Sequence, residues 1–129
     1  MIGTAPHKNI ERVAKAVAGL DVSLEVIGRL TPERLTALNT HVPVTCRYDL
    51  TDEALAQAYI DSDILMFPSL SEGFGLPILE AQSVGRPVIT PNRLPLSNVA
   101  GSGAIIVDPE DTAALRDAVE RLMSNPGLR

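Results

Sequence analysis

The sequence has little of what several classes of protein require. Cys46 is its single cysteine, which excludes an internal disulfide framework and a multi-cysteine metal site. Its uninterrupted apolar runs are no longer than the one from Ile64 to Phe67, far short of the roughly 20 residues that a membrane-spanning helix needs. We therefore expect no membrane span in this chain.

Two further shortages concern nucleic acid. Aromatic residues make up 3% of the chain and Trp is absent, so surfaces on which bases could stack are scarce. Lys and Arg number 11 against 16 Asp and Glu, which gives a net charge of −5. Proteins that bind a phosphate backbone usually have a basic face, so this acidic balance argues against nucleic acid as the main partner. We expect a cytoplasmic domain with no nucleic-acid partner.

What is present is the composition of one globular domain. The chain has 129 residues, of which 45% are hydrophobic and 21% charged, and this balance suits a single domain over 1–129 with its own core. Met1 and Ile2 run directly into the turn-forming segment Gly3-Thr-Ala-Pro6. We interpret them as the tail of a strand whose beginning is missing, and the chain as a piece of a larger enzyme.

Strand-like and helix-like segments alternate along the chain. The strand-like segments are short, apolar and rich in β-branched residues, and we expect strands at Ile2 and over 22–27, 42–46, 64–67, 87–90 and 104–107. The helix-like segments carry apolar residues at helical spacing, and we expect helices after the N-caps Asn9, Thr31, Thr51 and Asp111 and over 76–84. The connection 90–103 is expected to be a loop with one short helix.

This alternation predicts an α/β fold of the Rossmann-like kind. A mostly parallel sheet of about six strands would lie between two layers of helices, joined by right-handed crossovers. Six strands suit the order 3-2-1-4-5-6, in which a ligand binds at the carboxyl ends of the first and fourth strands. The unusual residues of this sequence follow those two strands, in segments 3–9 and 68–80.

The segment Glu72-Gly73-Phe74-Gly75 leads directly into a predicted helix at Leu76. Two glycines let the backbone approach a ligand, and the helix N-terminus adds partial positive charge and free N–H groups. Together with Lys8 from the facing segment, they predict an anion site that suits a diphosphate. The segment has no third glycine, as a dinucleotide fingerprint would, and the chain contains no Gly-Lys-Ser or Gly-Lys-Thr of a P-loop.

Two carboxylates flank this helix end, Glu72 in the loop and Glu80 on or just after the first turn. We expect both to point toward the crevice. Carboxylates in this position suit hydrogen bonds to vicinal hydroxyls, such as those of a ribose or a hexose.

At these residues the chain resembles the nucleotide-sugar-binding, C-terminal half of GT-B glycosyltransferases. The resemblance is carried by Glu72-x7-Glu80 within Ser-Glu-Gly-Phe-Gly-Leu-Pro-Ile-Leu-Glu-Ala and by the following Gly85-Arg-Pro-Val88. The segments 3–9, 63–69 and 107–109 are also similar to the family. The pattern is most similar to family 4, a retaining group that includes bacterial polysaccharide and mannosyl transferases.

The resemblance implies a role for each residue of the pattern. Glu80 would bind the ribose hydroxyls, and Glu72 would contact the hydroxyls of the donor sugar and place its anomeric carbon. Lys8 would stabilise the leaving diphosphate. The remaining residues that it implies for donor binding are Gly3, Thr4, Arg47, Tyr48, Gly73, Phe74, Gly75 and Leu76. Such enzymes use no prosthetic group and no catalytic metal, which agrees with the charge that Lys8 and the helix end can supply.

This chain departs from the family at two positions. The family usually has an Arg a few residues before the phosphate-binding Lys, whereas the segment from Gly3 to Lys8 has none. Arg29 and Arg93 are the candidates that could compensate. Asn98 stands where many relatives carry Glu.

Two hypotheses follow from the resemblance. The first is the donor-binding domain of a retaining hexosyltransferase, mannosyltransferase-like, in polysaccharide or glycoconjugate synthesis. Its substrate would be a GDP- or UDP-hexose and its acceptor a glycan or lipid-linked sugar, with acceptor contacts and any membrane association supplied by a missing N-terminal domain. The isolated chain would then bind the nucleotide sugar without turning it over.

The alternative is a non-catalytic nucleotide-sugar-binding subunit or remnant beside a separate acceptor-binding partner. An epimerase or phosphorylase of the same fold is a weaker hypothesis.

Some polar residues have simpler interpretations. We interpret His7 and His41 as surface histidines and Cys46 as a small core residue. The acid pair Asp61 and Asp63 could also form a phosphoacceptor site, but we expect Asp61 to end a helix and Asp63 to start the strand. For Phe74, a lid and a packing residue are equally good hypotheses.

Overall fold

The computed structural model describes residues 1–128 of the chain. Its strands are β1 (Leu24–Ile27), β2 (Val44–Arg47), β3 (Leu65–Met66), β4 (Val88–Pro91) and β5 (Ala104–Val107). Its α-helices are α1 (Ile10–Ala16), α2 (Pro32–Asn39), α3 (Asp52–Asp61), α4 (Leu76–Ser83), α5 (Leu96–Ala100) and α6 (Thr112–Ser124). Three short 3-10 helices cover Pro6–Lys8, Gly101–Gly103 and Pro126–Leu128. The predicted alternation of strands and helices is confirmed.

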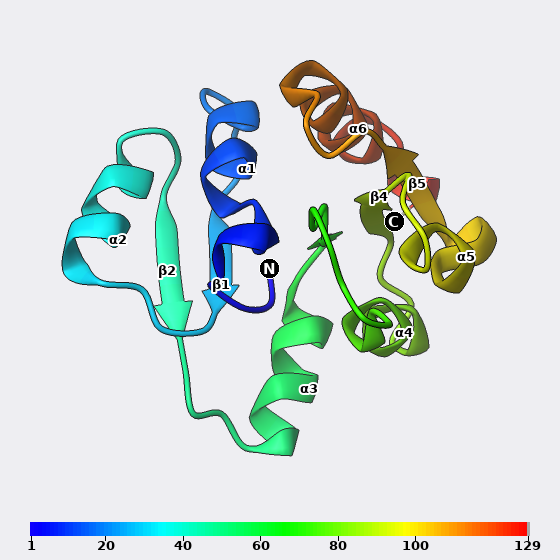
Figure 1. Ribbon diagram of the computed structural model, residues 1–129, viewed down its shortest axis with the longest axis horizontal. Coiled ribbons are helices and arrows are strands. Elements are labelled where there is room, and N and C mark those ends of the chain that lie inside the picture. Colours follow the sequence, from blue (N-terminus) through cyan, green and yellow to red (C-terminus); the bar gives the residue numbers. More distant parts are fainter. Residues whose placement is uncertain (129) are drawn as a thin grey trace.

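The strands form two parallel sheets. β1 pairs with β2, and β4 lies between β3 and β5. Ile2 adds a single parallel bridge to Ile27 on the free edge of β1. Figure 1 shows this N-terminal segment between the two sheets. Within each sheet the order follows the prediction, 3-2-1 for β2, β1 and Ile2 and 4-5-6 for β3, β4 and β5.

The prediction of one continuous sheet of six strands is wrong for the described residues. Ile2 contributes one bridge and β3 only two residues, so no ladder of hydrogen bonds joins the two sheets. Met1, Ile2, Ile64 and Leu65 instead line one small cavity. The two sheets are held together by side-chain packing and by hydrogen bonds between their loops.

The core that joins them is apolar and extends under both sheets. One cluster contains Val26 from β1, Met66 from β3 and Ile89 from β4, together with residues of α1 and α6. A second cluster packs Phe67 and Val88 against α3, α4 and α5. All of β4 is buried, as expected of a strand covered on both faces.

Most helix starts follow the sequence. The side chains of Thr31, Thr51 and Asp111 each accept a hydrogen bond from the backbone N–H three residues later, so these three predicted N-caps are confirmed. Asn9 also precedes a helix, but it adopts a left-handed conformation and makes no side-chain cap. Its predicted N-cap position is confirmed, but its side chain does not cap the helix because it bonds to other groups, as described below.

The remaining boundaries differ by a few residues. The strand over 64–67 shortens to β3, and the helix over 76–84 ends at Ser83, with Gly85 in the left-handed conformation after it. The short helix expected within 90–103 is α5. No helix within the described residues is long and apolar enough to cross a membrane.

Candidate functional site

Three loops meet at the carboxyl ends of the parallel strands. The backbone N–H of Leu70 donates to the carbonyl oxygen of His7 at 2.8 Å, which joins the loop after Ile2 to the loop after β3. The buried Asn9 side chain donates to the carbonyl oxygens of Pro68 at 3.1 Å and Pro109 at 2.7 Å. It thus ties together the loops that follow Ile2, β3 and β5.

Glu72 lies at the centre of this meeting point. Lys8 Nζ donates a hydrogen bond to Glu72 Oε1 and forms an ion pair with it. The buried Ser69 hydroxyl donates to the same oxygen at 3.1 Å, and His7 Nε2 lies 3.6 Å from it. The Lys8 and Glu72 side chains are 16% and 14% exposed, so they are only partly open to solvent. The structure therefore brings together the two residues that we expected to act on the reacting groups.

The position of Lys8 depends on its neighbours. Its ammonium group lies 5.0 Å from the centre of the buried Phe67 ring. A Cβ atom on Gly3 would come within 2.7 Å of Lys8 Cε, and Gly3 also has a φ of +89°. Glycine at this position gives the turn its left-handed conformation and leaves room for the lysine side chain.

The start of α4 has the backbone that an anion site requires. Gly75 is the N-cap with a φ of +89°, and a Cβ atom there would lie 2.4 Å from Leu96 Cδ2. Pro77 has no N–H, and the Ile78 N–H donates to the carbonyl oxygen of Gly75 at 3.0 Å, so the N–H groups left for a ligand here are those of Gly75 and Leu76. Gly73 has open space around its Cα, and Phe74 and Leu76 are each 56% exposed. Phe74 is not a packing residue in this structure.

Glu80 has a separate partner. It is the fifth residue of α4, on the second turn, and its Oε2 accepts a 2.6 Å hydrogen bond from the hydroxyl of Tyr59 on α3. Burial first, and then the hydrogen bond to Glu80 and its negative charge, raise the pKa of Tyr59 well above its ordinary value. The hydroxyl therefore stays protonated and donating at neutral pH.

The other predicted residues lie apart from the pair of Lys8 and Glu72. Thr4 packs against Gly28 and its carbonyl oxygen accepts a hydrogen bond from Arg34. Arg47 pairs with Glu25, and Tyr48 stacks under the Arg29 guanidinium at 4.0 Å. Among the described residues, no hydrogen bond or ion pair joins these groups to Lys8 or Glu72.

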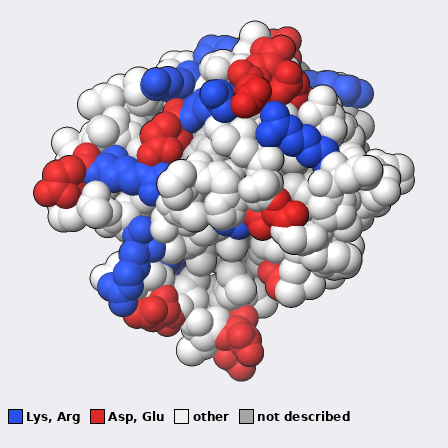
Figure 2. Space-filling view, viewed as in Figure 1, with Lys and Arg blue, Asp and Glu red and all other residues white. Residues whose placement is uncertain are grey.

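Arg93 lies closer to the site than Arg29 does. Its Nη1 donates to the carbonyl oxygen of Leu70 at 3.0 Å, in the loop that carries Glu72. Its Nη2 is 3.6 Å from Glu110. Arg29 is instead paired with Asp49 at 2.6 Å on the exposed surface. On the face shown in Figure 2, Lys and Arg are interspersed with Asp and Glu and form no broad basic patch.

Sequence reasoning missed three side chains at this site. His7 was interpreted as a surface histidine but lies beside Glu72, and Ser69 and Tyr59 were not singled out. The Pro-Ser turn after a buried strand could have indicated Ser69, since its hydroxyl is three residues before Glu72. No pattern in the sequence indicates Tyr59, because its contact depends on how two helices pack.

This arrangement can bind a ligand with negative charge and hydroxyl groups. A partly buried ammonium and a helix N-terminus lie beside one carboxylate, and a second carboxylate is held one helical turn further along α4. Within residues 1–128 no group of three or more His, Cys, Asp or Glu side chains could hold a metal ion.

The chain is similar to known glycosyltransferases. The profile of the family described as glycosyl transferases group 1 matches residues 1–125. The chain is 37% identical over 95 residues to the O-antigen chain mannosyltransferase B of Escherichia coli, covering 74% of this chain and 23% of that protein. It is 33% identical to the MMP alpha-(1->4)-mannosyltransferase of Mycolicibacterium hassiacum, covering 94% of this chain and 32% of that protein.

A solved structure of the same fold covers nearly the whole chain. Sucrose-phosphate synthase from Thermosynechococcus elongatus superposes with a TM-score of 0.79 at 27% identity, over 95% of this chain and 34% of that one. The α/β class predicted from the sequence, similar to GT-B glycosyltransferases, is thus confirmed. The chain spans about a third or less of the length of these proteins. It belongs to the group 1 glycosyl transferases.

Proposed function

We propose that this chain binds the nucleotide-diphosphate sugar donor of a retaining hexosyltransferase. The observation that carries the proposal is the pairing of Lys8 with Glu72 beside the N-terminus of α4, at the carboxyl ends of the strands. A diphosphate would replace Glu72 as the partner of Lys8 and accept hydrogen bonds from the N–H groups of Gly75 and Leu76 at the helix start. Glu72 would then be free to accept hydrogen bonds from the donor sugar.

The charge that develops on the leaving diphosphate supports the same assignment. When the bond between the anomeric carbon and the phosphate breaks, negative charge grows on the leaving diphosphate. The ammonium of Lys8 and the dipole of α4 are already in place to stabilise it, so no metal is required for this step. Glu80 would accept hydrogen bonds from the ribose hydroxyls, and Arg47 and Tyr48 would border the base.

Arg93 is the better candidate to replace the arginine that the loop 3–8 lacks. It already donates to the loop that carries Glu72, whereas Arg29 is occupied by Asp49 and Tyr48. A donor phosphate beside Lys8 would offer Arg93 a more strongly charged partner than the carbonyl oxygen of Leu70.

Three mannosyltransferases are among the relatives, which favours a donor that carries mannose. The acceptor, a glycan or lipid-linked sugar, would be held by a separate N-terminal domain. Acceptor binding and exclusion of water from the reaction would come from that domain. We therefore expect this chain to bind the donor without turning it over.

Calorimetric titration with GDP, UDP, GDP-mannose and UDP-glucose tests the proposal. We expect one of the two diphosphates to bind, with affinity reduced roughly 10- to 100-fold in Glu80→Ala, since hydrogen bonds to charged groups contribute about 1.5–3 kcal/mol. Glu53→Ala, which removes an exposed acid in the first turn of α3, is the matched control. The absence of binding to either diphosphate by the folded chain would refute the proposal.

The alternative is a nucleotide-sugar-binding subunit without catalysis of its own. The missing arginine in the loop 3–8 favours it. Co-purification separates the two cases, because a split enzyme would retain a stable partner that binds the acceptor. Turnover of a nucleotide sugar by the purified chain would exclude the alternative.

A further inference from the structure

One side chain outside the predicted site contacts it directly. The Tyr59 hydroxyl crosses from α3 to α4 and donates to Glu80 Oε2 at 2.6 Å. Only 6% of the Tyr59 surface is exposed. The bond therefore joins a core residue to the carboxylate that we propose for the ribose.

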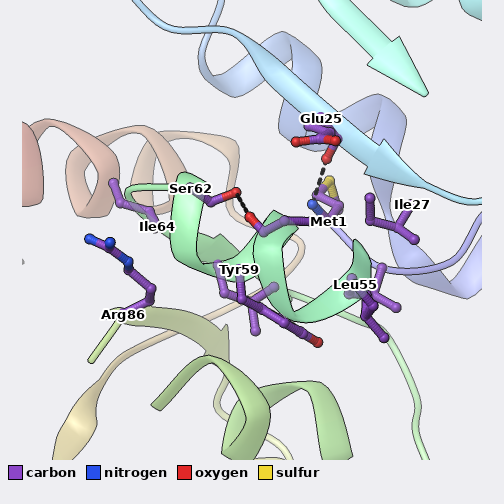
Figure 3. A pocket seen from close by; sticks show the side chains of 11 residues that line it. Met1, Glu25, Ile27, Leu55, Tyr59, Ser62, Ile64 and Arg86 are labelled. Atoms are coloured by element: carbon purple, nitrogen blue, oxygen red, sulfur yellow. Dashed lines mark hydrogen bonds between the residues drawn. The ribbon is translucent and has the colours of Figure 1, made fainter. Parts of the chain in front are cut away.

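The ring of Tyr59 is fixed by its surroundings. It packs in the apolar cluster that contains Phe67, Ile78 and Val88. It also lines a small cavity with Leu55 and Arg86, where its hydroxyl points away from Arg86 (Figure 3). Since the ring cannot turn without disturbing the core, the direction of its O–H donor is set by the packing of α3 against the sheet.

The backbone of Glu80 is held as well. The Ser83 hydroxyl donates to its carbonyl oxygen at 2.7 Å. Ser83 thus restrains the helix at this residue, while Tyr59 restrains the carboxylate itself. The two hydroxyls make comparable bonds to one residue but differ in whether they touch the group that would meet the ligand.

We propose that Tyr59 is a positioning residue that makes Glu80 selective for a ribose diol. By occupying Oε2 from the core side, it fixes the carboxylate plane and leaves Oε1 to accept from the hydroxyls of a bound nucleotide. Without Tyr59 the carboxylate turns among several rotamers, and ordering it again opposes binding. This inference rests on the proposed function, since it assigns Glu80 to the ribose.

The ratio of affinities for a ribose nucleotide and for its dideoxy analogue measures this role. Affinities are determined for GDP or UDP, whichever binds, and for its 2′,3′-dideoxy analogue, in the wild type, Tyr59→Phe and Ser83→Ala. We expect Tyr59→Phe to reduce the preference for the ribose form roughly three- to tenfold, the effect of about one hydrogen bond, and to leave dideoxy binding unchanged. Ser83→Ala should keep the wild-type preference.

The outcomes separate this inference from the proposed function. If Glu80→Ala abolishes the preference for ribose and Tyr59→Phe does not lower it, Tyr59 is structural only and the inference is wrong. If Glu80→Ala also keeps the preference, the assignment of Glu80 to the ribose fails instead.

A second measurement requires no variant at position 59. The chain contains two tyrosines, Tyr48 and Tyr59, so protein labelled with 3-fluorotyrosine gives two fluorine resonances, which Tyr48→Phe assigns. We expect the Tyr59 resonance to shift more with the ribose nucleotide than with its dideoxy analogue. Equal shifts with both nucleotides would overturn the inference.

Discussion

At the residue scale, the site depends on a few side chains with several partners each. Glu72 accepts from Lys8 and Ser69, and Asn9 donates to two loops that lie far apart in the sequence. Such groups have lost their water and depend on one another, so removing one of them leaves its partner unsatisfied. Variants at these positions therefore change both the site and the stability, and need controls that separate the two.

Gly75→Ala tests the conformation at the start of α4. The added Cβ would require a left-handed alanine and would lie 2.4 Å from Leu96 Cδ2. We expect a loss of about 2–4 kcal/mol in the free energy of unfolding, measured with urea. Gly85→Ala is the control, since Gly85 also has a positive φ but nothing within 4 Å, and it should lose only about 1 kcal/mol. Equal losses in the two variants would contradict the role of Leu96.

The Tyr59 hydroxyl predicts how stability depends on pH. Its pKa is raised in the folded state by burial and by Glu80, so the folded chain keeps this proton where the unfolded chain releases it. The stabilisation is fully present below the unfolded pKa of about 10 and is lost as the pH rises above it. Urea unfolding from pH 8 to 11 should show the wild type losing stability relative to Tyr59→Phe above about pH 10. A constant difference across this range would contradict the burial of the hydroxyl.

At the element scale, three helices begin at residues whose side chains accept a hydrogen bond from the first turn. Thr31, Thr51 and Asp111 cap α2, α3 and α6, and each bond spans three residues. The strands position the site through the topology of the sheet. Parallel strands bring their carboxyl ends to one edge, and the loops that follow Ile2 and β3 meet there although Lys8 and Glu72 are 64 residues apart.

Asp111→Ala tests one of these caps. Its carboxylate accepts a 3.0 Å hydrogen bond from the N–H of Ala114, and the loss of a cap costs about 0.5–2 kcal/mol in the free energy of unfolding. Asp117→Ala, an exposed aspartate within the same helix, should leave the stability unchanged or raise it slightly. A smaller loss for Asp111→Ala than for Asp117→Ala would be inconsistent with a cap.

Sequence alone predicts those parts of the fold and site that depend on local bonds or on topology. The caps at Thr31 and Asp111 can be predicted from the sequence because donor and acceptor are three residues apart. The contact between Lys8 and Glu72 is expected from the strand order. Asn9 precedes α1 as predicted, but the bonds of its side chain to Pro68 and Pro109 were not predicted, because they depend on the tertiary structure. The bond from Tyr59 to Glu80 depends likewise on helix packing, which periodicity does not describe.

At the scale of the whole molecule, two sheets share one apolar core. Val26 of one sheet and Met66 and Ile89 of the other belong to the same buried cluster, so the edge that carries the site depends on packing between sheets. Because no ladder of hydrogen bonds joins the two sheets within the described residues, the distance between the loops after Ile2 and β3 depends on this core and on the hydrogen bonds that His7 and Asn9 make between them.

Ile89→Ala tests this dependence. Ile89 is fully buried in β4, and its truncation should cost about 2–5 kcal/mol in the free energy of unfolding. Exposed Ile106→Ala on β5 should cost much less. If the proposed site is real, saturating nucleotide diphosphate at about 100 times its dissociation constant should restore about 2.7 kcal/mol in the variant. Thermal unfolding with and without nucleotide measures both effects, and equal losses in the two variants would contradict a shared core at Ile89.

The most direct test of the central claim compares the two lysines of the chain. Lys8 is partly buried against Glu72, whereas Lys15 is an exposed residue of α1. Calorimetric titration with GDP or UDP should show affinity reduced about 10- to 100-fold in Lys8→Ala and unchanged in Lys15→Ala, because only Lys8 would contact the diphosphate. If Lys8→Ala binds the diphosphate as tightly as Lys15→Ala does, the site at the start of α4 does not hold it.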